Sequence, residues 1–370
     1  MVARIVISPV VPDVIGTFET SRGAIGLALT GMWAGYALMQ FASGVLGATY
    51  GERPVMVASV GLTGVASLGL ALSPSYVAFA IMAVLLGASA GLYFSAGSTL
   101  LTRRFENTGQ ALGFHSTGGP LAGLVGPLAA VVVANAWGWR AALAIGAAVA
   151  IPVSLFLLWR VEPTPPAADG RSLRSQVDVR ELLGILRRPS IAFTVAVAVL
   201  VYFVWQSLYS FFPTFLEQHW ELSSGLASLL FAGVFAGTAV SLPVVGRLSD
   251  VVGRDALLGG SFLLLAGGLG LLVVGERFAV AVLGSALIAV GMGFPGALNS
   301  RFMDHFAVGE RGQGFGLVRS VNLLLGSVGS VVTGLLADAY GWVVAFGLLG
   351  AVLLAPIGLL AGNRLLHGRY

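Results

Sequence analysis

The sequence predicts an all-α membrane protein with twelve transmembrane helices in two pseudo-symmetric six-helix bundles. Its composition, its apolar segments and an internal repeat carry this prediction. Of the 370 residues, 57% are hydrophobic and only 10% are charged, whereas a soluble domain carries about 25% charged residues. So few charges cannot cover the surface of a soluble enzyme of this size. A disordered chain is also excluded, because it would need low hydrophobicity and high charge.

Apolar segments long enough to cross a bilayer follow one another along the chain. A membrane-crossing helix needs about 20 mainly apolar residues. Reading between turn signals such as Gly51–Pro54, Pro74 and Gly138 gives eleven expected spans. They cover residues 24–48, 54–73, 76–100, 108–136, 139–160, 190–216, 224–246, 255–275, 278–300, 311–337 and 341–363.

The stretch before residue 20 predicts a twelfth, shortened helix. It is apolar from Ile5 to Phe18 but contains Pro9, Pro12 and Asp13. It lacks the charged start and small-residue cleavage site of a signal peptide. We therefore expect a first transmembrane helix that lacks about a dozen residues of its first turns.

The arginines predict the orientation. If the loop at residues 49–54 is cytoplasmic, most loop arginines lie on the cytoplasmic side, and only Arg22, Arg140 and Arg277 lie outside. Positively charged loops stay in the cytoplasm. The expected protein therefore sits in the cytoplasmic membrane, surrounded by lipid, with both termini inside.

Landmarks recur in the same order in both parts of the chain, and such repeats reveal duplicated folds. At offsets of 201 to 203 residues, the pairs are Pro12 and Pro213, Gly44–Gly51 and Gly246–Gly253, Gly109–Gly113 and Gly312–Gly316, and Gly138 and Gly341. This repeat predicts an N-terminal six-helix bundle at residues 1–160 and a C-terminal one at 190–370. Residues 161–189 are the longest polar stretch and predict a cytoplasmic linker with a short amphipathic helix at Val177–Leu186.

The loop at Gly246–Arg254 carries a recognisable pattern. Gly246, Leu248, Asp250, Gly253 and Arg254 follow the order Gly-x-Leu-x-Asp-x-x-Gly-Arg. With two six-helix halves and a polar central loop, the whole chain resembles the major facilitator superfamily. The resemblance implies a secondary transporter fold, and it says little about the substrate.

This loop is the expected gating motif. The resemblance implies that Asp250 locks the cytoplasmic side while the outer side is open, and the alternative is a plain turn with an acid that caps a helix. The first-half copy keeps Gly44, Gly51 and Arg53 but has Ala48 at the aspartate position. Gating by the first copy is therefore expected to be weak or asymmetric.

Arg319 is the most informative single residue, because it lies about eight residues inside a span. A charge at the centre of a membrane helix costs about 2.5–3.5 kcal/mol on insertion scales, so such residues usually face a cavity or a partner. No carboxylate lies deep in a span to neutralise it, which favours an anion in a cavity. The alternatives are lipid headgroups or a pair with Asp304.

Polar and aromatic residues recur at helical spacing and predict a cavity face. The expected substrate-binding residues are Arg319, Asn322, Tyr36, Gln40, Tyr202, Gln206, Tyr209 and Tyr93. Interhelical packing is the rival interpretation. His115 and Asp13 are candidates for proton coupling, since a histidine titrates near neutral pH, and structural roles are the alternative for both.

Several classes of chemistry lack their residues. There is no Cys, and only four His residues are present, so neither thiol chemistry nor a metal centre is expected. No phosphate-binding glycine loop ending in Lys-Ser or Lys-Thr occurs, and the dispersed arginines do not predict nucleic-acid binding. No catalytic group of side chains is recognisable. An enzyme and a cofactor are therefore not expected.

The predicted function is secondary transport of a small solute, most simply an organic or inorganic anion, by alternating access. The protein is expected to act as a monomer, with protons as a candidate coupling ion. Export of lipophilic drugs is one alternative. A membrane sensor that does not transport is the other.

Overall fold

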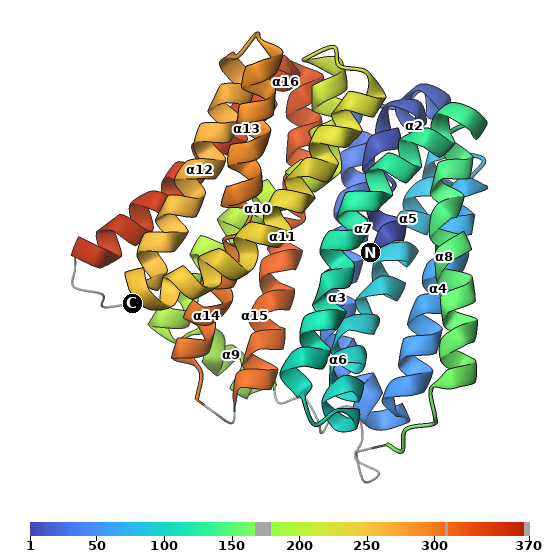
Figure 1. Ribbon diagram of the computed structural model, residues 1–370, viewed down its shortest axis with the longest axis vertical. Coiled ribbons are helices and arrows are strands. Elements are labelled where there is room, and N and C mark those ends of the chain that lie inside the picture. Colours follow the sequence, from blue (N-terminus) through green and yellow to red (C-terminus); the bar gives the residue numbers. More distant parts are fainter. Residues whose placement is uncertain (167–178, 308–309, 366–370) are drawn as a thin grey trace.

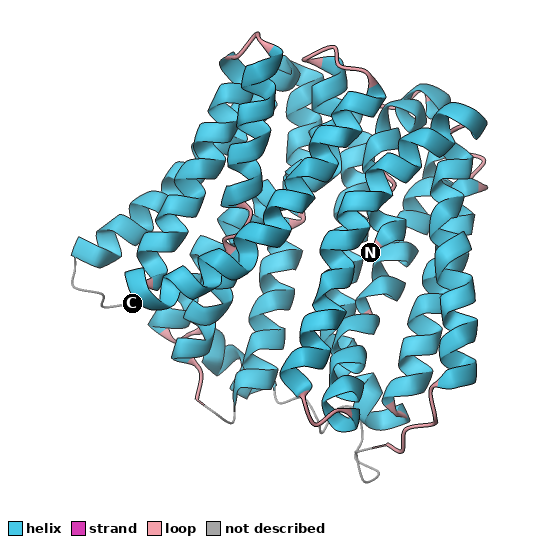
Figure 2. Cartoon of the chain, viewed as in Figure 1, coloured by secondary structure: helices cyan, strands magenta, loops and turns pink. Residues whose placement is uncertain are grey.

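The computed structural model describes residues 1–166, 179–307 and 310–365, and every regular element in these ranges is helical (Figures 1 and 2). The first-half helices are α1 (Val2–Ile5), the 3-10 helix η1 (Ser8–Val10), α2 (Val11–Phe18), α3 (Arg22–Tyr50), α4 (Glu52–Ala71), α5 (Tyr76–Gly91), α6 (Tyr93–Arg104), α7 (Thr108–Trp137) and α8 (Trp139–Arg160). The second-half helices are α10 (Pro189–Gln218), α11 (Ser224–Val252), α12 (Arg254–Val274), α13 (Phe278–Gly291), α14 (Pro295–His305), α15 (Arg311–Gly326) and α16 (Val328–Leu365). Between them lies α9 (Val179–Leu186).

The described helices account for a bilayer-spanning bundle. Ten helical segments within them are long and apolar enough to cross a membrane. The last of these, Gly314–Leu365, has 52 residues, about 78 Å of helix, which is enough for two crossings of a roughly 30 Å core. The short helices α1, η1 and α2 form one further segment, which Pro9 and Pro12 interrupt. The prediction of an all-α membrane protein is confirmed.

Four glycines turn the chain between helices in the same way. Gly51, Gly138, Gly253 and Gly341 have φ angles of 88°, 85°, 104° and 81°, a region that a side chain with a Cβ rarely adopts. Gly51 matches Gly253 in the internal repeat, and Gly138 matches Gly341. The repeat therefore reappears as two pairs of equivalent turns.

Two ends of the molecule can be distinguished in Figure 1. We call the end that carries α9 and residues 161–166 the linker end, and the opposite end, where α2 lies, the far end. The expected amphipathic helix begins at Val179 in the structure, and the first two residues of its predicted range lie outside the described residues. Ile185 of α9 is buried against the rest of the protein.

A polar cluster joins the two halves at the far end. The carboxylate of Asp338 on α16 accepts the main-chain N–H groups of Arg22 and Gly23, the first residues of α3, at 3.0 and 2.7 Å. The Arg22 guanidinium donates to Gln218 of α10 at 2.8 and 3.0 Å and lies over the Trp342 ring. This group, Arg22, Gly23, Gln218, Asp338 and Trp342, is called the far-end clasp below.

Below the clasp, α3 and α16 pack closely enough for backbone contact. Thr30 of α3 donates to the Ser327 carbonyl at 2.8 Å and accepts the N–H of Val331 at 3.1 Å. A Cβ at Gly26 would lie 2.5 Å from the Ser330 carbonyl oxygen, so only glycine fits at this crossing.

In the described ranges, no ion pair joins the two halves at the linker end. Each ion pair there joins two residues of the same half, where Glu162 is counted with the first half and Arg188 with the second. These pairs are Arg103 with Glu52, Arg104 with Glu162, Arg188 with Glu310, Arg254 with Asp250 and Asp304, and Arg301 with Asp255. Hydrogen bonds and ion pairs thus tie the halves together at the far end, whereas the ion pairs of the described residues at the linker end each lie within one half.

Candidate substrate site

An aromatic cluster lies between the halves, near the middle of the bundle. Trp33 and Tyr36 come from α3, and Tyr202, Trp205 and Tyr209 come from α10. Spacings of three and four residues place these rings on one face of each helix. The Trp33 and Trp205 ring centroids are 5.4 Å apart, and Trp205 stacks on Tyr209 at 4.0 Å. The rings of both halves therefore form one wall.

Arg319 of α15 lies at this wall without an acidic partner. Its Nε is buried and has no hydrogen-bond partner, and its guanidinium lies over the ring of Phe94 from α6, 4.6 Å from the centroid. The predicted alternative partner, Asp304, binds Arg254 instead, at 3.0 Å. Among the described residues, no carboxylate lies within ion-pair distance of Arg319.

A second arginine, Arg4 of α1, reaches the same place from the first half and is buried. It is 7% exposed, and its Nε and Nη1 have no hydrogen-bond partner. Its guanidinium lies 3.8 Å from the centroid of the Tyr36 ring and 5.1 Å from that of Trp33. In the described part of the chain, Nη2 has one hydrogen-bond contact, with the sulfur of Met1. No carboxylate there forms an ion pair with Arg4.

The two guanidinium groups converge on one tyrosine, because both Arg4 and Arg319 interact electrostatically with the Tyr36 side chain. Two positive charges without counter-charges in a partly desolvated place repel each other. A bound anion would relieve this repulsion and satisfy the unpaired N–H groups. The convergence on Tyr36 therefore gathers positive charge from both halves at one point.

Small cavities flank this point. One is lined by Tyr202, Asn299, Arg319 and Asn322, with apolar residues around them. Another is lined by Arg4, Trp33 and Tyr209, with Ser8 and Ser210. Each cavity thus has one of the two arginines in its wall.

The predicted amide residues are all buried, and each carries an unsatisfied atom. Asn322 Oδ1, Gln40 Nε2 and Gln206 Oε1 lack hydrogen-bond partners, although Gln206 Nε2 donates to the Leu323 carbonyl at 2.8 Å. Buried unpaired polar groups are costly unless a ligand or water meets them. Of the three, Asn322 lines a cavity with Arg319, while Gln206 fastens α10 to α15.

The remaining predicted residues lie farther from the arginines. Tyr93 packs its ring on His115 at 5.5 Å, and His115 also packs on Phe94 at 6.1 Å. His115 therefore packs against Phe94, the residue whose ring the Arg319 guanidinium covers. Asp13 is exposed on α2 toward the far end, and it interacts electrostatically with Glu217 of α10.

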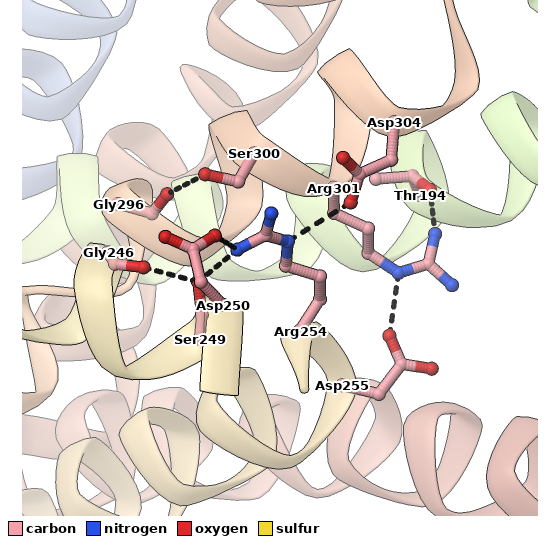
Figure 3. Close-up of polar contacts among 10 residues, drawn as sticks. All are labelled: Thr194, Gly246, Ser249, Asp250, Arg254, Asp255, Gly296, Ser300, Arg301 and Asp304. Atoms are coloured by element: carbon pink, nitrogen blue, oxygen red, sulfur yellow. Dashed lines mark hydrogen bonds and ion pairs between the residues drawn. The ribbon is translucent and has the colours of Figure 1, made fainter. Parts of the chain in front are cut away.

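The second-half motif forms a closed polar network at the linker end (Figure 3). Arg254 donates to Asp250 and, at 3.0 Å, to Asp304 of α14, so it connects α11, α12 and α14. Gly296 of α14 makes the approach of α11 to α14 possible, because a Cβ there would lie 2.9 Å from the nitrogen of Gly246. In the structure, Asp250 therefore acts through an arginine of its own loop.

A second pair in the same view fastens the lower part of this half. Arg301 of α14 is 3% exposed, and it donates to Asp255 of α12 at 2.7 Å and to Thr194 of α10. Asn363 of α16 donates to the other Asp255 oxygen at 2.8 Å. Four helices thus meet in one buried polar group, which stiffens the second half at the linker end.

The first-half motif is built with the opposite charge. Glu52 occupies the place of Arg254 in the repeat, is 1% exposed, and pairs with Arg103 of α6 at 2.8 Å. Gly51 supplies the turn, and Gly44 lies beside Ser95 of α6. The N–H of Arg53 donates to Thr164, and its side chain donates to the Leu158 carbonyl.

Sequence reasoning did not assign Glu217, Arg4 or Phe94 to a site. The half-buried Glu217 lies near the end of the spanning helix α10. The depth of Arg4 could not be set from the sequence, although the repeat offset of 201 at Pro12 and Pro213 pairs it with Trp205, next to the predicted Gln206. Phe94 carried no signal, because a lone phenylalanine in an apolar helix is usually packing.

Comparisons with known proteins agree with this architecture. The family model described as "Major Facilitator Superfamily" matches residues 1–227 and 194–362. A solved structure of a bacterial homolog to the human lysosomal transporter Spinster, inward-facing and occupied, superposes with a TM-score of 0.85 at 17% identity, covering 100% of this chain and 95% of that one. At this identity the likeness concerns the fold alone.

Two curated relatives match parts of the chain. Membrane sensor protein UhpC of Escherichia coli (strain K12) is 30% identical over 159 residues, 42% of this chain and 36% of the relative. Multidrug resistance protein MdtG of Citrobacter koseri is 27% identical over 256 residues, 64% of this chain and 61% of the relative. The chain spans less than two thirds of the length of either relative. With the family model matching nearly its whole length, the chain belongs to the major facilitator superfamily.

Proposed function

We propose that this protein is a secondary transporter that moves a small anion across the cytoplasmic membrane by alternating access. One observation carries the proposal: the guanidinium groups of the buried Arg4 from the first half and the half-buried Arg319 from the second converge on Tyr36, and no carboxylate of the described residues forms an ion pair with either. An anion bound there would hold groups from both halves, which is what a substrate must do to favour an occluded state.

The charge count favours an anionic group with two negative charges. Each guanidinium can form a bidentate pair with an oxyanion. One unit charge at about 4 Å from another is worth about 4 kcal/mol at an effective dielectric constant of 20, before the cost of dehydrating the ligand. A tetrahedral dianion offers enough oxygens for both arginines.

The proposed working cycle uses two rigid halves, residues 1–160 and 190–370, joined by 161–189. The arginine bias in the sequence supports a cytoplasmic linker end and two cytoplasmic termini. With the far-end clasp made and no ion pair between the halves among the described residues of the linker end, the structure fits the state that is open to the cytoplasm. We propose that the protein acts as a monomer, with protons as the coupling ion to be tested.

Uptake into proteoliposomes tests this function. A panel of sulfate, phosphate and small carboxylates is offered with and without a pH gradient. Arg319→Ala should reduce anion uptake at least a hundredfold, and Arg319→Lys should keep part of it, because lysine retains the charge without the planar fork. Arg277→Ala, which removes an exposed far-end arginine, serves as the control. Unchanged uptake in both Arg319 variants would contradict the proposal.

Export of lipophilic compounds is the second candidate. The stacked Trp205 and Tyr209 rings offer an apolar surface to aromatic solutes, and one relative bears the name of a multidrug resistance protein. In that case overexpression should raise drug tolerance, and Arg319→Ala should leave the tolerance unchanged. A sensor without transport, as the name of the other relative suggests, would bind an anion in vesicles without any flux.

A further inference from the structure

We propose that Phe94 is a positioning residue for the anion site: from the first half, its ring holds the Arg319 guanidinium of the second half in its binding orientation. The inference rests on the proposed function and deepens it. Because Phe94 and Arg319 belong to different halves, the Phe94 ring can orient Arg319 only while the two halves are arranged as in this structure.

The contact uses one face of the guanidinium and leaves its edges available. Arg319 lies over the Phe94 ring, 4.6 Å from the centroid, within the range of a cation–π interaction. Oxyanions bind guanidinium groups along the edge, in the plane of the N–H bonds. Stacking on Phe94 and binding of an anion therefore do not compete, and the stacking fixes the plane in which the anion must approach.

Phe94 can do this because its own helix start is fastened to α3. α5 ends at Gly91, and α6 begins at Tyr93. A Cβ at Gly91 would touch the carbonyl of Tyr36, and Ser43 of α3 accepts the N–H of Ala96 at 3.2 Å. The Phe94 ring is thus held in register with Tyr36, the residue on which both arginines converge.

The contact also lies where it can report on the movement of the halves. The contact between Arg319 and Phe94 joins the second-half helix α15 to the first-half helix α6. The hydrogen bonds between the halves in the described residues lie at the far end or beside the aromatic cluster. His115 of α7 packs on two neighbouring residues of α6, Tyr93 and Phe94. When the halves rotate, the ring and the guanidinium must separate, and Arg319 loses its fixed plane.

Sulfate binding to the purified full chain tests this proposal, with uptake kinetics in proteoliposomes as the second readout. Phe94→Leu keeps an apolar side chain but removes the π face, and Phe94→Tyr keeps the π face. We expect Phe94→Leu to weaken sulfate binding three- to tenfold and to raise KM with little change in kcat, and Phe94→Tyr to stay within twofold of the unaltered protein. Phe114→Leu, at an exposed site of α7, is the matched control.

A double-mutant comparison separates positioning from packing. In an Arg319→Gln background, Phe94→Leu should change sulfate binding by less than twofold, because the group it positions is gone. Equal losses in the Leu and Tyr variants, or a Leu effect that persists without Arg319, would overturn the proposal. If Phe94→Leu does not fold, Phe94→Met takes its place in the same comparison.

The two levels of the account fail differently. An effect of Arg319→Gln on sulfate binding together with a silent Phe94→Leu variant would overturn the positioning role and leave the anion function standing. Unchanged sulfate binding in Arg319→Gln would overturn the proposed function and the positioning role with it.

Discussion

Replacing Asp338 by asparagine should open the far end of the molecule. Asp338 accepts the N–H groups of Arg22 and Gly23 at 3.0 and 2.7 Å, and its carboxylate lies 3.8 Å from the Arg22 guanidinium. Because these N–H groups start α3, the carboxylate of the second half caps a helix of the first half. All of these contacts must break before substrate can enter from the far end.

The size of the effect follows from the geometry. A hydrogen bond to a charged group contributes about 1.5–3 kcal/mol when buried, and side-chain exposures of 32% and 28% for Arg22 and Asp338 reduce this by solvent screening. Asparagine keeps one acceptor oxygen and loses the charge. We therefore expect a loss of about 2 kcal/mol, which shifts the ratio of far-end-closed to far-end-open molecules about thirtyfold.

Distance measurements between spin labels can detect this shift, and the absence of cysteine from the chain leaves no background labelling. Labels on Pro74→Cys and Glu276→Cys report on the two sides of the far end. Asp338→Asn should increase the long-distance population, whereas Glu221→Gln, which removes an exposed charge at the same end, should leave it unchanged. An identical distance distribution in the Asp338→Asn protein would refute the role of the clasp.

Three further predictions concern stability, measured as the thermal unfolding midpoint in detergent. Arg103→Gln should lower the stability of the folded protein by about 1–2 kcal/mol more than Glu52→Gln does. The reason is that Arg103→Gln leaves the carboxylate of Glu52, which is 1% exposed, buried and unpaired. Equal losses in the two variants would contradict this. Gly87→Ala should cost about 1–3 kcal/mol, because its Cβ would overlap a main-chain carbonyl of α3, and a neutral result would argue against this helix crossing. The Arg188 guanidinium beside Glu310 lowers the pKa of that carboxyl. The pair therefore stabilises the folded state above the usual pKa of glutamate and loses this effect as the pH falls through the lowered value. The difference in unfolding midpoint between the unaltered protein and Glu310→Gln should vanish in acid.

Much of the fold could be predicted because helix spacing and turn chemistry are local. The repeat identified Gly51 with Gly253 and Gly138 with Gly341, and these four residues adopt equivalent turns with positive φ. Local patterns could not predict where helices break within a span. The fourth span divides at Leu92 into α5 and α6, because contacts with α3 decide the break, and these contacts join residues about 50 positions apart.

The site was predictable only in part, for a similar reason. Arg319 was identifiable because a charge within a span is costly, and Tyr36 and Tyr202 followed from helical spacing. The convergence of Arg4 with Arg319 joins residues more than 300 positions apart, and only the three-dimensional arrangement reveals it. The sequence showed the departure at Ala48 in the first copy of the motif, but it did not show that Glu52 pairs with Arg103.

Equilibrium binding of sulfate and methyl sulfate to the purified chain tests the central claim most directly. The two ligands share a tetrahedral sulfur centre and differ in charge. If Arg4 and Arg319 together bind one group, sulfate should bind at least tenfold more tightly than methyl sulfate, and Arg4→Gln or Arg319→Gln should each remove this preference. Equal affinity for the two ligands in the unaltered protein, or a preference that survives both substitutions, would contradict the account.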